Sequence, residues 1–141
     1  MEIAASLERV WTVAADVPAS PVWQPALEEV DTLETDAEGR AVLVDTSSDA
    51  IVRKTKQQLR FSFDAPTAMS WVQIKGDVKS LEGSWEFVEL AAERTRATFA
   101  LAVDPGRVLG LLLRGPVEGK VKEFLTKGAA EGLKQHVESA G

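Results

Sequence analysis

The chain begins with apolar residues at the spacing of an α-helix. The positions that would share one helical face, after Ser6 as the N-cap, are Leu7, Val10, Trp11 and Ala14. Pro18 and Pro21 would end this helix, because proline lacks a backbone N–H and restricts the residue before it. We also expect a very short strand at Glu2–Ala4, and one helical turn over Pro21–Ala26 with Pro21 at its first position.

The middle of the chain carries apolar residues at alternate positions. A period of two predicts β-strands, and the short links between them favour antiparallel neighbours. In the clearest case Leu59, Phe61 and Phe63 face one side, and the polar residues between them face the other. The strands predicted in this way are 27–34, 41–46, 59–64, 69–75, 80–90 and 95–103.

The helical period returns after the turn at Asp104–Gly106. The apolar stripe of this last region consists of Val117, Val121, Phe124, Leu125, Gly128, Ala129 and Leu133. Pro116 would break a helix if it lay deep inside one, so we predict a short helix over 108–114 and a main helix over 116–139. At about 1.5 Å per residue the main helix would be about 35 Å long, which is enough to cross about five or six strands.

A one-sided antiparallel sheet must cover its apolar face, and the terminal helix is the predicted element long enough to do so. The order of elements therefore predicts an α+β fold. In it, a curved antiparallel sheet of about six to seven strands wraps around a long C-terminal helix, with short helices after the first strand. Such a sheet cannot pack tightly against one helix everywhere, and the gap is a natural place for a ligand.

The composition of the chain limits the kinds of partner that it can be expected to bind. The 141 residues suit one domain over 1–141, and the net charge of −6 argues against nucleic acid or an anionic membrane as a partner. No apolar run approaches the roughly 20 residues of a membrane span, so we expect no stable membrane insertion. The chain has no cysteine, which excludes disulfides and thiolate chemistry and fits a cytoplasmic location.

Four stretches of sequence, in this order, carry a family resemblance. They are "IAASLERVWTVAADV", the loop with Trp23-Gln24-Pro25, "MSWVQIKGDVKSLEGSWEF" and "TRATFALAVDPG". Together they resemble the polyketide cyclase/dehydrase-like branch of the START and birch-pollen-allergen (Bet v 1-like, SRPBCC) superfamily, whose fold is called the helix-grip. The resemblance implies binding of apolar small molecules or lipids, with only a subset of members being enzymes. The first strand is shorter than in that family, and Gly115-Pro116 is unusual for its terminal helix.

Catalytic candidates are few. His136, the one histidine, is expected to be exposed near the end of the last helix, and we predict neither a metal site nor a cofactor. Asp45 and Asp49 are weak candidates for general acid or base work, since an apolar pocket would raise their pKa. Glu82 should point outward if the face with Trp85 points inward.

Large aromatic residues are the stronger signal of a binding site. The candidate ligand-binding residues are Trp23, Phe61, Phe63, Trp71, Trp85, Phe87, Phe99 and Phe124. Most of them are expected to be plain core, but large aromatic residues over a curved sheet also line ligand cavities. Gly83, in mid-strand, is expected to mark a bulge or sharp bend. The Trp23 loop should fold back against the terminal helix, with its indole buried at a cavity end and its N–H on a polar partner; alternatively, one buried Trp pins a surface loop.

Three functions remain open at this point. The first is non-catalytic binding of a small hydrophobic or amphipathic molecule, lipid- or polyketide-like, in an internal cavity. The second is a polyketide cyclase or dehydratase in which Asp45, Asp49 or Ser47 moves protons. The third is an interaction module or homodimer that uses the exposed sheet face or the loop near Gly106–Gly115, which contains the apolar segment Val108–Leu113.

Overall fold

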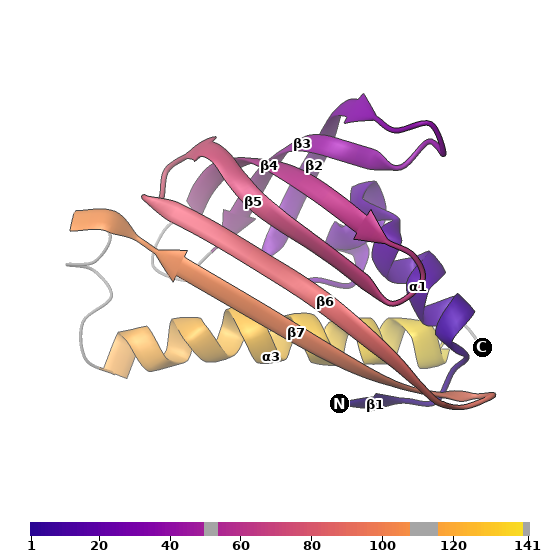
Figure 1. Ribbon diagram of the computed structural model, residues 1–141. Helices are drawn as coiled ribbons and strands as arrows, with labels where there is room; N and C mark the ends of the chain where they lie inside the picture. The colour runs from indigo at the N-terminus through magenta and orange to yellow at the C-terminus, as the bar shows by residue number, and fades with distance from the viewer. Residues whose placement is uncertain (50–53, 108–115, 140–141) are drawn as a thin grey trace.

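The computed structural model describes residues 1–49, 54–107 and 116–139 of the chain. The predicted helix over 108–114, and with it the segment Val108–Leu113, lies outside the described residues. The described elements, in chain order, are β1 (Glu2–Ile3), α1 (Leu7–Ala15), the 3₁₀ helix η1 (Val17–Val22), β2 (Leu27–Thr35), β3 (Ala41–Asp49), β4 (Lys54–Asp64), β5 (Ala68–Gly76), β6 (Ser80–Ala91), β7 (Arg94–Asp104) and α3 (Pro116–Ser139) (Figure 1).

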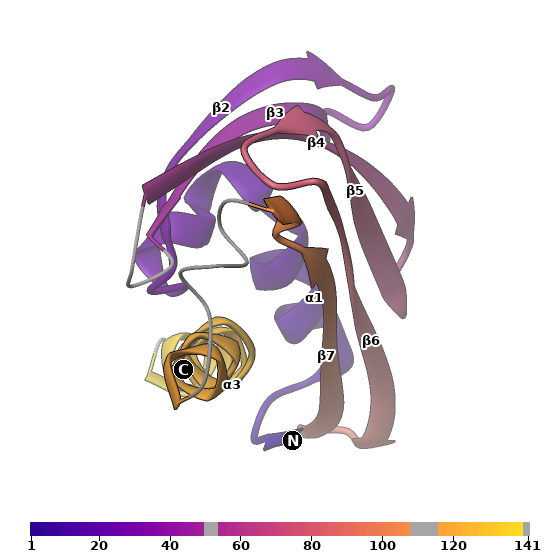
Figure 2. The ribbon, with the colours of Figure 1, turned by 90° about the vertical axis from the view of Figure 1, so that its left-hand side faces the viewer.

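The described strands form one antiparallel sheet of 7 strands in the order β1-β7-β6-β5-β4-β3-β2. Figure 2, which looks roughly along α3, shows the sheet curving around this helix, with α1 also on the concave side. The predicted helix-grip architecture is therefore confirmed. β1 is short, because it pairs with β7 only at Glu2 and Ile3.

Two strands extend further than their apolar pattern. β3 continues to Asp49 instead of ending near residue 46, and β4 begins at Lys54 instead of near residue 59. In the added segments the inward positions of the alternation carry polar side chains, of which Thr55 and Gln57 are buried. Polar residues at inward positions do not give the apolar alternation that is typical of a buried strand face. The pattern alone therefore ended β3 too early and began β4 too late.

The segment between α1 and β2 differs from the prediction. Ser6 caps α1 as expected, because its Oγ accepts a hydrogen bond from the Arg9 backbone N–H at 3.2 Å. The next helical turn is η1, which spans Val17–Val22 instead of Pro21–Ala26. Pro18, and not Pro21, lies in its first turn, where a missing N–H costs nothing. The predicted position was wrong because both prolines satisfy the same rule.

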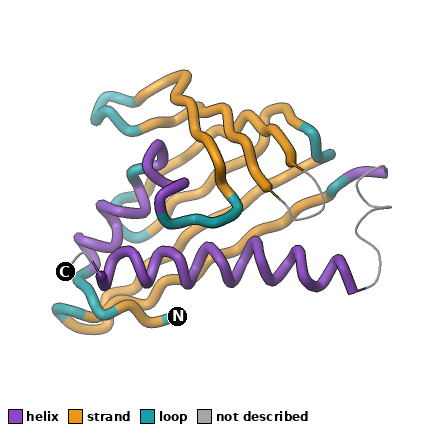
Figure 3. Tube along the Cα trace, turned by 180° about the vertical axis from the view of Figure 1, so that it is seen from behind, coloured by secondary structure: helices purple, strands orange, loops and turns teal. Residues whose placement is uncertain are grey.

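The helix α3 has the predicted bounds, and its C-terminal end is fixed to β1 and α1 (Figure 3). The Ala4 backbone N–H donates to Glu138 Oε2 at 3.0 Å, and Lys134 Nζ donates to the Glu2 carbonyl at 2.9 Å. Arg9 Nη2 donates to the Val137 carbonyl at 2.7 Å. These bonds hold the C-terminal end of α3 against the short edge strand and α1. None of the described helices is long and apolar enough to cross a membrane.

The core lies between the concave face of the sheet, α1 and α3. Near α1, the Trp11 ring meets the edges of Phe63 and Phe87, with ring centroids 6.3 Å and 6.2 Å apart. On the helix side, Leu133 and Val137 of α3 are fully buried. This end of the interior is solidly packed, which leaves the other end, towards the start of α3, for a cavity.

Candidate functional site

An internal cavity of about 140 Å³ lies between the sheet, the loop after η1 and the first half of the described part of α3. Its wall combines aromatic, aliphatic and neutral polar side chains. The lining residues are Ala14, Val17, Ser20, Trp23, Gln24, Ala26, Leu27, Val30, Thr46, Ser48, Thr55, Gln57, Leu59, Phe61, Met69, Trp71, Val78, Leu81, Trp85, Phe99, Leu101, Val103, Pro105, Val121 and Leu125. None of these described lining residues carries a charge.

One wall of the cavity is a continuous aromatic surface across four neighbouring strands. Trp71 of β5 stands between Phe61 of β4 and Phe99 of β7, with ring centroids 5.5 Å and 5.7 Å away. Phe99 in turn lies 4.8 Å from Trp85 of β6. The four residues are close because β4 to β7 are adjacent in the sheet and their inward positions are in register.

Gly83 explains how Trp71 lies flat on the sheet. Gly83 pairs directly with Trp71 across β5 and β6, and no register shift occurs there. A Cβ atom at Gly83 would come within 2.5 Å of Trp71 Cε2 and Cζ2. The expectation of a bulge was therefore wrong, whereas that of a sharp bend stays a prediction: the missing side chain makes room for the indole that forms part of the cavity wall.

The Trp23 loop closes the cavity against α3. The Trp23 side chain is 6% exposed, and its ring lies 6.2 Å from that of Trp85. A Cβ at Gly132 of α3 would overlap the Trp23 carbonyl oxygen and would lie 3.5 Å from Pro25 Cδ. The loop thus folds back on the helix as expected. The expected partner of the indole is missing, however, because Trp23 Nε1 is buried and no described residue accepts its hydrogen.

Four polar side chains on β3 and β4 form a polar patch on the same sheet, beside the aromatic wall; the patch consists of Thr46, Ser48, Thr55 and Gln57. Gln57 is at its centre and is 5% exposed. Its Oε1 accepts hydrogen bonds from Thr46 Oγ1 and Ser48 Oγ, both at 3.4 Å, and its Nε2 donates to Thr55 Oγ1 at 2.7 Å. The one hydrogen of Thr46 Oγ1 is shared between Gln57 Oε1 and the Gln57 carbonyl, which lies 3.2 Å away. These residues were not among the predicted site residues.

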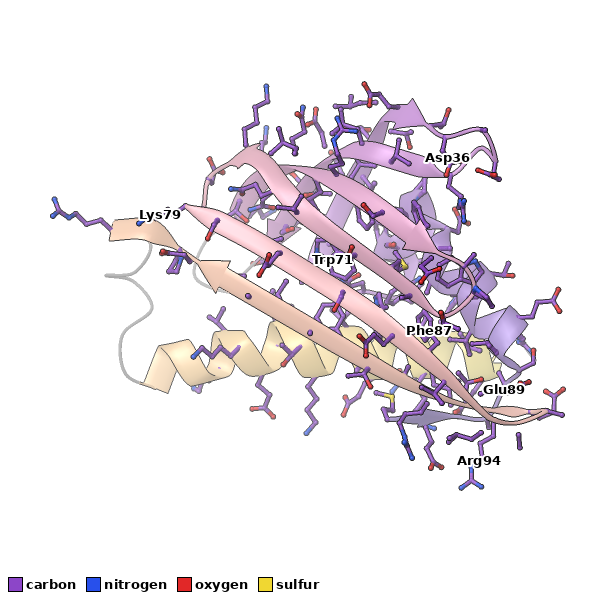
Figure 4. The ribbon with its side chains drawn as sticks, in the orientation of Figure 1. Asp36, Trp71, Lys79, Phe87, Glu89 and Arg94 are labelled. Atoms are coloured by element: carbon purple, nitrogen blue, oxygen red, sulfur yellow. The ribbon has the colours of Figure 1, made fainter. Side chains whose placement is uncertain are left out.

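The structure divides the eight predicted aromatic residues into two groups. Trp23, Phe61, Trp71, Trp85 and Phe99 line the cavity, whereas Phe63, Phe87 and Phe124 do not. Phe63 and Phe87 pack against Trp11, and Figure 4 labels Phe87 beyond Trp71 in the direction of α1. At Phe124 the neighbouring residue Leu125 takes the lining position. Contact of any of these residues with a ligand stays a prediction.

The predicted acidic and hydroxyl candidates for catalysis lie outside the cavity. Asp45 is exposed on the outer face of β3, where its Oδ1 accepts a hydrogen bond from Gln58 Nε2 at 3.3 Å. Ser47 lines a shallow depression on that same face, and alternation gives Asp49 the same side of the strand. Glu82 is exposed, as expected. The idea that Asp45, Asp49 or Ser47 moves protons inside the cavity therefore needs correction, because Thr46 and Ser48 occupy the inward positions.

His136 also lies away from the cavity. It is half-buried, not exposed as expected, and it borders a surface groove between α3 and the Trp23 loop. Its neighbours in the groove include Val22 and Glu131, and the cavity lining does not include it. Among the described residues, no group of three or more Asp, Glu or His side chains is placed to hold a metal ion.

Among the described residues, two carboxyl groups have a lowered pKa, and both are remote from the cavity. For Glu138, the hydrogen bond from the Ala4 backbone N–H, followed by that from Lys134, lowers the pKa. For Asp36, in the turn between β2 and β3, desolvation raises the pKa but the hydrogen bonds and charge of Arg40 lower it more (Figure 4). Both shifts therefore belong to structural contacts at the surface of the molecule.

Comparison with known proteins agrees with this architecture. A family model described as polyketide cyclase/dehydrase and lipid transport matches residues 3–127. A START superfamily protein from Mycobacterium smegmatis is similar in structure, with a TM-score of 0.86 and 20% identity over 100% of this chain and 95% of that one. A protein of Thermus thermophilus gives a TM-score of 0.84 and 21% identity over 100% of this chain and 95% of its own.

An enzyme is among the structural neighbours as well. The Zhui aromatase/cyclase from Streptomyces sp. R1128 has a TM-score of 0.74 and 21% identity over 98% of this chain and 90% of that one. At identities this low the likeness shows the fold alone. No curated protein sequence matches the chain closely enough to count as a relative.

Proposed function

Because the chain belongs to the polyketide cyclase/dehydrase and lipid transport family, we propose that its internal cavity binds one small hydrophobic or amphipathic molecule. The observation that carries the proposal is the cavity of about 140 Å³ with its aromatic wall and its uncharged lining. Apolar lining with a few grouped polar side chains is the usual composition of small-molecule sites. Burial of the ligand's apolar surface would supply the binding energy, at roughly 25 cal/mol per Å².

The cavity volume limits the size of the ligand. A cavity of about 150 Å³ in another protein accommodates a single benzene molecule, and sites for drug-sized ligands are about 300–1,000 Å³. At about 140 Å³ the cavity therefore suits a molecule with about one ring. A long acyl chain would need the cavity walls to move apart.

Binding without catalysis is the better explanation of this lining. General acid–base chemistry needs an ionisable group within hydrogen-bond reach of the substrate. The described lining residues include no Asp, Glu, His, Lys or Arg, and Asp45 lies on the outer face of the sheet. The likeness to an aromatase/cyclase is a likeness of fold, and the cyclase alternative has no matching group in the described part of this cavity.

A titration with ethylbenzene, followed by NMR, tests the proposal. Ethylbenzene is expected to bind with a Kd of about 1 mM, given roughly 0.5 kcal/mol per non-hydrogen atom. Leu125→Trp would fill the cavity, and we expect it to weaken binding by at least about tenfold. Phe124→Trp is the matched control, since its position is adjacent on α3 but outside the lining.

Saturable binding in the parent chain and in Phe124→Trp, with loss in Leu125→Trp, would support the proposal. No saturable shift in the resonances of Phe61, Trp71 or Phe99 would contradict it, as would equal affinities of the two variants. A cytoplasmic location, a homodimer and the absence of a nucleic-acid partner stay predictions from the sequence.

A further inference from the structure

We propose that the polar patch makes the cavity selective for an uncharged ligand with a hydrogen-bond-accepting oxygen, such as a ketone, and that Gln57 positions this oxygen. The inference rests on the proposed binding function and adds a chemical class to it. Its basis is the balance of donors and acceptors in the cavity wall, together with the lack of charge in the described lining.

Gln57 has one more donor than the protein uses. A side-chain amide has two N–H donors and one oxygen that accepts two hydrogen bonds. The Gln57 oxygen accepts from Ser48 and shares the one hydroxyl hydrogen of Thr46 with the Gln57 carbonyl, whereas the amide nitrogen donates one hydrogen bond, to Thr55. One N–H of the buried amide is thus left without an acceptor among the described residues, at the surface of the cavity.

Thr55 adds a second spare donor next to the first. Its hydroxyl oxygen accepts the hydrogen bond from Gln57 at 2.7 Å. Its own hydrogen has no acceptor in the described part of the chain, although Thr55 is buried and lines the cavity. Since both spare groups donate, the complementary ligand group is an acceptor. The unpaired Nε1–H of Trp23, in the same lining, adds to this excess of donors.

The class of acceptor follows from charge. A carboxylate also accepts hydrogen bonds, but a buried charge needs an opposite charge beside it. The described lining holds no lysine, arginine or histidine. Fatty acids and other carboxylates would lose their hydration without gaining a counter-charge, whereas a neutral carbonyl loses little and satisfies the spare donors. A pure hydrocarbon fits the aromatic wall but leaves the donors unpaired.

The test compares acetophenone with ethylbenzene, its hydrocarbon counterpart, and with benzoate. Because water solvates the ketone better than the hydrocarbon, the measured quantity is the ratio of the two affinities, compared between protein variants. Gln57→Leu removes the amide, and Gln58→Leu is the matched control, since Gln58 is the next residue and bonds to Asp45 on the outer face. All affinities are measured by NMR titration of the full chain.

We expect Gln57→Leu to lower the preference for acetophenone by about five- to tenfold, which is the value of one hydrogen bond to a buried donor. Gln58→Leu should leave the preference unchanged within about twofold. Benzoate should show no binding at concentrations at which acetophenone saturates the protein. Equal preferences in the parent chain and Gln57→Leu, or benzoate binding as tightly as acetophenone, would overturn the inference. If neither neutral ligand binds the parent chain, the proposed function fails as well.

A second measurement does not depend on the folding of Gln57→Leu. The side-chain amide resonances of Gln57 in the parent chain should move downfield with acetophenone, because a new acceptor meets the free N–H. Ethylbenzene should bind without this downfield shift. An equal downfield shift of the Gln57 resonances with both ligands, or no shift at saturation with acetophenone, would refute the role of Gln57. Either result would leave the proposal of apolar binding intact.

Discussion

A methyl group added at Gly132 would test the contact between α3 and the Trp23 loop, which closes the cavity. The new Cβ would overlap the Trp23 carbonyl oxygen and lie 3.1 Å from its carbonyl carbon. The overlapped atom belongs to the backbone, so no side-chain rotation can relieve the contact. Either the loop must lift away from the helix or the helix must move away from the sheet.

Gly128, one helical turn earlier, provides a matched comparison. Its Cβ would meet Pro25 Cγ at 3.8 Å and Phe124 Cδ1 at 3.9 Å, which are ordinary contacts. Both Gly→Ala substitutions gain about 1 kcal/mol of helix propensity. Gly128→Ala should therefore raise the free energy of unfolding by about 0.5–1 kcal/mol. Overpacking costs about 1–3 kcal/mol, and the upper value suits a rigid backbone contact, so Gly132→Ala should lower the free energy of unfolding by about 2 kcal/mol.

Urea denaturation followed by far-ultraviolet circular dichroism measures both free energies. The two variants should differ by about 3 kcal/mol, which corresponds to about 10 °C in Tm for a chain of this size. Tryptophan fluorescence of the native state should change in Gly132→Ala alone, because its loop carries Trp23. If Gly132→Ala were as stable as Gly128→Ala, the loop would not rest on α3 as described, and the account of the cavity end would be wrong.

Three further predictions concern the sheet wall, the core and the helix end. Gly83→Ala should displace the Trp71 indole, with a changed near-ultraviolet circular dichroism spectrum and at least about tenfold weaker ethylbenzene binding by NMR titration; an unchanged spectrum and affinity would contradict the packing. Met69→Ala removes a side chain that is 4% exposed and lines the cavity, so urea denaturation should show a loss of about 2–4 kcal/mol; a loss below about 1 kcal/mol would count against it. Since hydrogen bonds from a backbone N–H and a lysine lower the pKa of Glu138, its stabilisation exists above its usual pKa and disappears as pH falls through the lower, folded value. Glu138→Gln should thus be less stable than the parent chain at about pH 7 and equal to it at about pH 2, unlike Glu131→Gln, and a gap that persisted in acid would refute this.

Much of the fold could be predicted because its elements follow simple periods. The bounds of α3 were predicted correctly, since Pro116 marks its start and an apolar stripe runs along it. β5, β6 and β7 lie within one residue of the predicted ends, because turn residues bound each run and large apolar residues such as Met69, Trp85 and Phe99 recur at its inward positions. The wrong position of η1 shows the limit: two prolines near each other fit the same turn rule, and only packing chooses between them.

The polar patch was missed because the apolar alternation stops where the inward residues of β3 and β4 become polar. Val44 of β3 faces inward, so the alternate residues Thr46 and Ser48 face inward as well. Leu59 of β4 also faces inward, and so does Gln57, two residues before it. Parity alone could therefore have found these residues. It would also have placed Asp45 outside. Their hydrogen bonds could not have been predicted, since they depend on how β3 and β4 pair.

The contact between Gly83 and Trp71 could not be predicted from the sequence, for a different reason. A glycine in mid-strand fits both a bulge and a close approach, and the sequence holds no sign of which applies. Cross-strand register decides, because it sets Trp71 directly opposite Gly83. The unpaired Nε1 of Trp23 is likewise a property of the packed loop.

The central claim is that the sheet and α3 leave a space between them with a largely apolar lining, and xenon tests it most directly. Dry apolar cavities of about 150 Å³ bind this gas, and binding needs no knowledge of the natural ligand. A crystal of the protein under xenon pressure should show one strong peak between Trp71, Phe61 and Leu125, the residues that line opposite sides of the cavity. Side chains that fill this volume, with no xenon peak there under pressure, would contradict the account.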